Sequence, residues 1–146
     1  MDRTSSMGLW TYAKDYMEAG HIVISNMPRA LPPTPAYYLC CHAIELALKA
    51  YLRGTGARIL DLKKIGHDLL NAYNEALRVG LKGIYELTQE QIDAIELVNN
   101  MYSNKEFEYI KTGFKTLPQI GVLYGTATSL VYALKPFCYE KRDIHN

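Results

Sequence analysis

Apolar residues recur at the spacing of an amphipathic helix in five stretches of this 146-residue chain. These stretches cover residues 6–25, 34–53, 67–79, 88–102 and 118–136. No stretch shows the two-residue alternation that is typical of a half-buried strand. The pattern therefore predicts an all-α bundle of four or five helices. The length of the chain fits one domain, residues 1–146, that buries a sizeable core.

The second predicted helix has clear start and stop signals. Thr34 is a good N-cap, and Pro35 fits the first helical position, where no amide donor is needed. Gly54 or Gly56 supplies a left-handed stop. The following segment, residues 54–66, is predicted to be a loop that leads to the third helix.

The later helices have their own boundary signals. Gly80 closes the third helix, and Thr88 with Gln91 forms a capping box at the start of the fourth. Pro136 is predicted to kink or end the last helix, because a proline ring clashes with the carbonyl four residues earlier. Residues 103–118 lack clean periodicity and are predicted to be an irregular connection.

One polar stripe interrupts the otherwise apolar second helix. Successive residues turn by about 100°, so the four polar side chains share an arc of roughly 80°. A helix that is apolar over most of its circumference is surrounded by other helices, which makes this helix central. The stripe consists of His42, Glu45, Lys49 and Arg53.

Two interpretations of this stripe stay open. Glu45 and Lys49 form an ordinary i,i+4 pair, so the stripe could be the solvated side of a core helix. In the other interpretation, the stripe faces a groove shared with residues 67–79, where charged groups meet a ligand or partner.

The third helix begins with a second candidate group, His67 and Asp68. Asp68 is favoured at a helix start by the dipole and is expected to cap it. Capping is the plain interpretation of this pair. In the alternative, His67 folds back against Glu45 and ties the third helix to the second.

The overall charge argues against a strongly basic nucleic-acid binder. The chain has 16 basic and 15 acidic residues, a net charge of +1. Two segments nevertheless place cations beside aromatic rings, which can hold phosphates and stack bases. Their candidate nucleic-acid or nucleotide surface comprises Tyr109, Lys111, Lys115 and Arg142. The alternative is an ordinary solvated loop pinned by its aromatic residues.

Several classes of protein are not expected from this sequence. No apolar run is long enough to span a membrane, and the start of the chain lacks a secretion signal, so a cytoplasmic protein is expected. Cys40, Cys41 and Cys138 do not form a CxxC pair, and the four histidines do not complete a zinc pattern. We therefore expect buried free thiols, no metal site and no cofactor.

The stretches "CHAIELALKAYLRGTG" and "KKIGHDLLNAYNEAL" together resemble the HEPN family of helical domains, over about residues 35–77. The resemblance implies an up-and-down bundle that commonly dimerises. Members of that family include RNA-cleaving toxins, partners of small nucleotidyltransferases, and non-catalytic modules associated with nucleotides or RNA. Glu45, Lys49 and His67 match the family's "E…K…GHD" signature, in which they are expected to be mainly scaffold.

The sequence departs from the ribonuclease members of that family. Those members carry an Arg, four to six residues and then a His near the C-terminus, whereas Arg142 and His145 have only two residues between them. The expectation is therefore a non-catalytic, homodimeric module that binds a nucleotide, RNA or a protein such as a nucleotidyltransferase, in a toxin–antitoxin or defence context. One alternative is a metal-independent ribonuclease that uses His67 with Arg53 or Lys49. Another is a structural oligomerisation domain.

Overall fold

The computed structural model describes residues 4–27, 33–107 and 116–144, and this part of the chain is helical with no strand. Six α-helices and one 3-10 helix follow in the order α1 Ser6–Asn26, α2 Thr34–Gly54, α3 Ile59–Ile65, α4 Leu69–Arg78, η1 Leu81–Gly83, α5 Gln89–Ser103 and α6 Ile120–Glu140. The predicted all-α bundle is confirmed. None of the described helices is long and apolar enough to cross a membrane.

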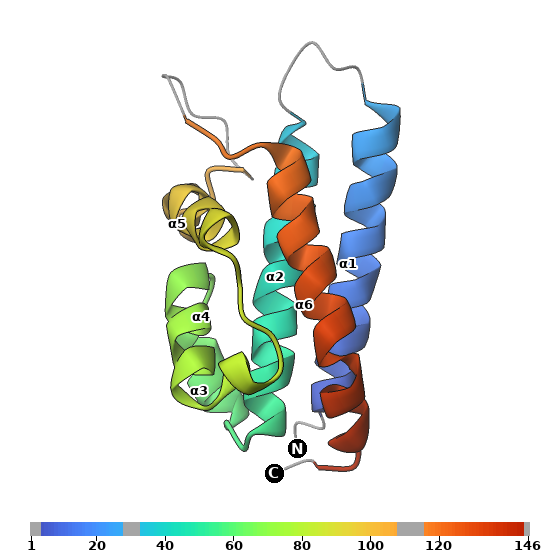
Figure 1. Cartoon of the computed structure of the whole chain (residues 1–146), viewed down its shortest axis with the longest axis vertical. Coiled ribbons are helices and arrows are strands. Elements are labelled where there is room, and N and C mark those ends of the chain that lie inside the picture. The colour runs from blue at the N-terminus through green and yellow to red at the C-terminus, as the bar shows by residue number, and fades with distance from the viewer. Residues whose placement is uncertain (1–3, 28–32, 108–115, 145–146) are drawn as a thin grey trace.

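Helix α2 is the centre of the bundle, as its apolar sequence predicts. Sixteen of its 21 residues are buried. Figure 1 shows α1 and α6 as long rods beside α2, with the shorter α3, α4 and α5 grouped along its other side. A helix covered from both sides must be apolar around most of its surface, and α2 is.

Helix α1 runs antiparallel to both α2 and α6. The hydroxyl of Ser6, at the start of α1, donates to the carbonyl of Ala50 near the end of α2 (2.6 Å). The indole of Trp10 donates to the carbonyl of Val131 in the second half of α6 (2.6 Å). Both donors are buried polar groups with a partner, so they fix the register of α1 without a desolvation penalty.

Helices α2 and α6 run in the same direction, because α3, α4 and α5 carry the chain back to the starting end of α2 (Figure 1). The Tyr37 hydroxyl donates to the carbonyl of Pro118 near the starts of the two helices. Near their ends, the rings of Tyr51 and Phe137 lie 4.9 Å apart. Helix α1 is therefore antiparallel to both of its neighbours, whereas α2 and α6 are parallel to each other.

Local signals placed several boundaries correctly. Thr88 and Gln91 form the predicted capping box, with Gln91 N donating to the Thr88 hydroxyl and Thr88 N donating to the Gln91 side chain. Gly56 and Gly80 have φ of +108° and +105°, which favours glycine at both helix ends. Thr34, however, is the first helical residue rather than the cap.

One boundary prediction is wrong, and Pro136 does not end the last helix, which was one of the two outcomes predicted for it. The segment predicted as a loop contains α3, whose seven residues are too few to show helical periodicity; Asp61 accepts from the backbone N–H of Arg58 at its start (2.9 Å). Helix α6 continues through Pro136 to Glu140. Pro136 and Tyr132 both lie on the exposed face, where water can satisfy the carbonyl that loses its donor.

Gly54 is the last residue of α2, and it allows close helix packing rather than ending the helix in a left-handed conformation. A Cβ atom at this position would lie 2.5 Å from the Phe137 ring and 3.0 Å from the Ser6 hydroxyl. Helices α1, α2 and α6 can therefore converge at this end of the bundle only because residue 54 has no side chain.

We expect Gly54→Ala to lower the free energy of unfolding by about 1–3 kcal/mol, because the added methyl group overpacks this junction. Gly125→Ala in α6 is the matched control, since a Cβ there meets nothing within 4 Å. That change should be neutral or stabilise the protein by about 0.5–1 kcal/mol through helix propensity. Urea denaturation measures both; equal effects at the two sites would contradict the packing role of Gly54.

Candidate functional site

The carboxylate of Glu45 is the centre of a buried polar cluster. Its side chain is only 4% exposed. Its Oε1 accepts from the Tyr102 hydroxyl (2.5 Å) and lies 2.8 Å from His67 Nδ1, while its Oε2 accepts from Lys49 Nζ (2.8 Å). These partners come from α2, from α5 and from the turn before α4, so one charge joins three parts of the fold.

The turn before α4 is shaped by Gly66. Its φ of +62° and ψ of −133° fit glycine, and its carbonyl accepts a hydrogen bond from Lys49 Nζ (2.7 Å). The next residue, His67, thereby reaches Glu45, which confirms the predicted tie between the two helices. Asp68 caps α4 by accepting from the backbone N–H of Asn71 (3.0 Å), as expected.

Rings surround the cluster. His42 Nδ1 lies 2.8 Å from the Tyr102 hydroxyl and 3.6 Å from Glu45 Oε1. Tyr16 of α1 meets the His42 ring edge-on (centroids 4.4 Å apart), and Tyr38 stacks on it (5.7 Å). We call the partly buried rings of Tyr16, Tyr38, His42 and His67 the ring face. Tyr16, Tyr38 and Tyr102 were all missed from the sequence. The one sequence signal was the i,i+4 spacing of Tyr38 and His42.

The electrostatics keep Glu45 ionised. Burial alone would raise the pKa of this carboxyl, but the contacts with His42, Lys49 and His67 outweigh burial and lower the pKa to about 2. Burial and the neighbouring carboxylate raise the pKa of Tyr102 far above its ordinary value. Tyr102 therefore stays protonated, and its hydroxyl donates a hydrogen bond to Glu45.

Arg53 does not join this cluster, although the stripe predicted that it would. Its Nε donates to the carbonyl of Thr4 (3.0 Å), and its Nη1 donates to the carbonyl of Ala57 (2.9 Å). Arg53 thus fastens the chain before α1 and the turn after α2. The stripe is divided into a cluster of three residues and a separate structural arginine.

Of the predicted basic and aromatic surface, only Arg142 lies within the described residues. Its guanidinium covers the Tyr139 ring (4.0 Å) and donates to the Tyr139 carbonyl (2.8 Å). Tyr109, Lys111 and Lys115 lie outside the described residues. The convergence of the two basic segments therefore stays a prediction.

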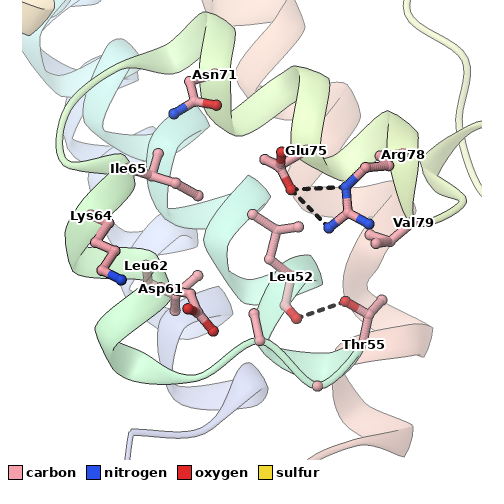
Figure 2. Close-up of a pocket in the computed structure, with 12 residues that line it drawn as sticks. Leu52, Thr55, Asp61, Leu62, Lys64, Ile65, Asn71, Glu75, Arg78 and Val79 are labelled. Atoms are coloured by element: carbon pink, nitrogen blue, oxygen red, sulfur yellow. Dashed lines mark hydrogen bonds and ion pairs between the residues drawn. The ribbon is translucent and has the colours of Figure 1, made fainter.

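A separate cleft of about 550 Å³ lies between the end of α2, α3 and α4 (Figure 2). Its rim carries the Glu75–Arg78 ion pair (2.9 Å), and Leu52, Leu62 and Val79 contribute apolar lining. Neither Glu45 nor His67 lines it. The cleft therefore adjoins α4, which lies within the 67–79 segment where a groove was predicted. The polar stripe of α2 does not face into this cleft.

One group within the described part of the chain has the composition of a metal site. His42, Glu45 and His67 each offer one ligand atom, and these atoms lie within 4.8 Å of one another.

The cysteines are not part of this group of possible metal ligands. All three are buried and free, and burial raises the pKa of Cys40 to about 12, so they are unreactive thiols, as predicted.

Comparison with known proteins leaves the family open. No family model, no curated protein and no solved structure matches the chain.

Glu45→Gln should lower the free energy of unfolding by about 3 kcal/mol near neutral pH, because Lys49 then stays buried without its counter-charge. The carboxyl pKa is about 2 in the folded protein against an ordinary 4.5. Its stabilising contribution is therefore complete above pH 4.5 and is lost as the pH falls towards 2.

The stability gap between wild type and Glu45→Gln, measured by denaturation in EDTA at several pH values, should shrink across that window. Glu96→Gln is the control, because Glu96 lies on the exposed face of α5. A gap that stays constant with pH would show that the charge of Glu45 is not what stabilises the fold.

Proposed function

We propose that this protein is a HEPN-like, non-catalytic binding module whose ring face takes the unpaired bases of a nucleotide or of single-stranded RNA. The observation that carries the proposal is the grouping of partly buried rings from α1, α2 and the turn before α4 around one anchored carboxylate. Flat rings bind bases by stacking, which needs little positive charge and accepts any base. This fits a chain with a net charge of only +1.

Hydrogen bonds within the cluster hold its rings in place, which favours the binding of a ligand. Glu45 holds His67 at Nδ1, and Tyr102 lies between Glu45 and His42. Ring orientation is therefore fixed before a ligand arrives, which lowers the entropy cost of binding. The His67 side chain is 42% exposed, so its imidazole is accessible to a ligand.

The HEPN-like assignment rests on the resemblance and on how its residues meet. In the "E…K…GHD" signature, Glu45 contacts both Lys49 and His67, which supports a scaffold role for the three residues. By resemblance, the protein is also expected to be cytoplasmic and homodimeric, and to act beside a nucleotidyltransferase in a toxin–antitoxin or defence setting. Light scattering at two concentrations tests the dimer, and a monomeric mass at both would argue against it.

A ribonuclease is the second candidate. The Glu45–His67 contact resembles a carboxylate-oriented general base, and the His42 ring lies 6.5 Å from the His67 ring. Two of its proposed cations are otherwise engaged, however. Lys49 binds Glu45 and Gly66, and Arg53 binds Thr4 and Ala57. A cation for the phosphate is therefore missing from this set, which is why we place binding first.

Tyr38→Ala should weaken binding of a fluorescent single-stranded RNA at least fivefold, since loss of one stacked base costs about 1–3 kcal/mol. Tyr132→Ala, on the 55%-exposed outer position of α6, is the matched control and should leave the affinity unchanged. Fluorescence anisotropy with RNA, and competition by mononucleotides, distinguishes the two ligand sources. Equal losses in both variants, or no binding to either ligand, would rule out the ring face as a base-binding site.

Incubation with mixed RNA tests the enzyme candidate. We expect no cleavage by the wild-type protein. Cleavage that is lost in His67→Gln and retained in His21→Gln, a control on the exposed face of α1, would instead establish the ribonuclease.

A further inference from the structure

We propose that His42 Nδ1, Glu45 Oε1 and His67 Nδ1 form a binding site for a divalent transition-metal ion of the zinc class. No sequence motif indicates such a site, because its three ligands are separated by 3 and 22 residues and follow no zinc spacing. The inference is independent of the proposed nucleic-acid role. It depends only on the geometry of these donors.

The distances between the donors are close to those a metal ion requires. Bonds of about 2.0–2.1 Å in a tetrahedral site separate neighbouring ligands by about 3.3–3.5 Å. His42 Nδ1 lies 3.6 Å from Glu45 Oε1, and His67 Nδ1 lies 2.8 Å from it. One ligand atom from each of the three residues lies within 4.8 Å of those of the other two. A movement of the partly exposed His67 ring by up to about 1.5 Å brings its nitrogen to the tetrahedral spacing.

Hydrogen bonding identifies the ring nitrogen that carries a proton in each histidine when no metal ion is bound. Tyr102 donates its only proton to Glu45, so His42 Nδ1 must carry the proton that the Tyr102 oxygen accepts. Since ionised Glu45 has no proton to give, His67 Nδ1 is likewise a donor. Metal binding requires the lone pair of Nδ1 in both imidazoles, so the ring proton is then carried by Nε2.

The surroundings have the features of an outer shell. Lys49 binds the other carboxylate oxygen, Oε2, and so orients Glu45 while leaving Oε1 for the ion. Tyr102 lies against Oε1 and can hydrogen-bond a water in the fourth position. Two imidazoles and one carboxylate are typical ligands of zinc and its neighbours, whereas magnesium and calcium prefer oxygen donors alone.

An entry path exists on the side of His67. Its side chain is 42% exposed, compared with 17% for His42 and 4% for Glu45. An ion reaches the buried carboxylate by displacing the contact between Glu45 and His67, while the pair of Glu45 with Lys49 stays in place. The rings of Tyr16 and Tyr38 flank His42 and limit access from its side.

Calorimetric titration of EDTA-treated full-length protein with zinc chloride tests the site. We expect one ion per chain, with affinity at least tenfold weaker in both His42→Gln and His67→Gln. His21→Gln should bind like the wild type, because His21 is exposed and contacts only the Tyr124 ring among aromatic side chains in the described part. Equal affinity in all four proteins, or no binding below millimolar zinc, would overturn the proposal.

Cobalt(II) supplies a readout that does not depend on the variants folding. Tetrahedral binding by two imidazoles and a carboxylate gives strong visible d–d bands without thiolate charge-transfer absorption. Thiolate bands would place the ion on the cysteines, and weak octahedral bands would place it on the surface; either result overturns the proposal. If circular dichroism shows that His67→Gln is unfolded, His42→Gln and the cobalt spectrum decide the question.

Discussion

The structure depends on one buried negative charge. A carboxylate inside a helical bundle costs several kcal/mol unless charged and hydrogen-bonding partners surround it. Glu45 obtains these partners from Lys49 one turn later, from His67 before α4 and from Tyr102 in α5. Because each partner belongs to a different position in the fold, satisfying the charge also fixes where α4 and α5 lie against α2.

The other side of α2 follows a different rule. Where α1 and α6 pack against it, most contact is made by apolar side chains and by small residues that let the backbones approach, with single hydrogen bonds such as that from Ser6 to Ala50. A Cβ at Gly20 would lie 3.3 Å from Cys40 Sγ, and one at Gly54 would meet Phe137 at 2.5 Å. Close packing therefore determines one side of the central helix, and a polar network determines the other.

The sequence predicted those features that depend on neighbours in the chain. Capping at Thr88 and the glycine ends at Gly56 and Gly80 are local, and the Glu45–His67 contact followed from one helix and the motif after it. The contribution of Tyr102 could not be predicted, because nothing in α5 marks the residue that points at α2. The separation of Arg53 was missed for another reason. A helical wheel gives its angle, but eight residues also move it about 12 Å along the axis from Glu45.

The same hydrogen bonds determine what the proposed ligand would have to displace. A ligand that enters the cluster must replace existing partners, and the cost rises with how deeply each partner is buried. The Lys49 side chain is 11% exposed and also binds Gly66, so it stays with Glu45 in any bound state. His67 is 42% exposed and sits on a short turn, so it is the partner that yields first. Within the cluster, Lys49 is therefore the structural partner of Glu45, and His67 is the partner that a ligand would displace.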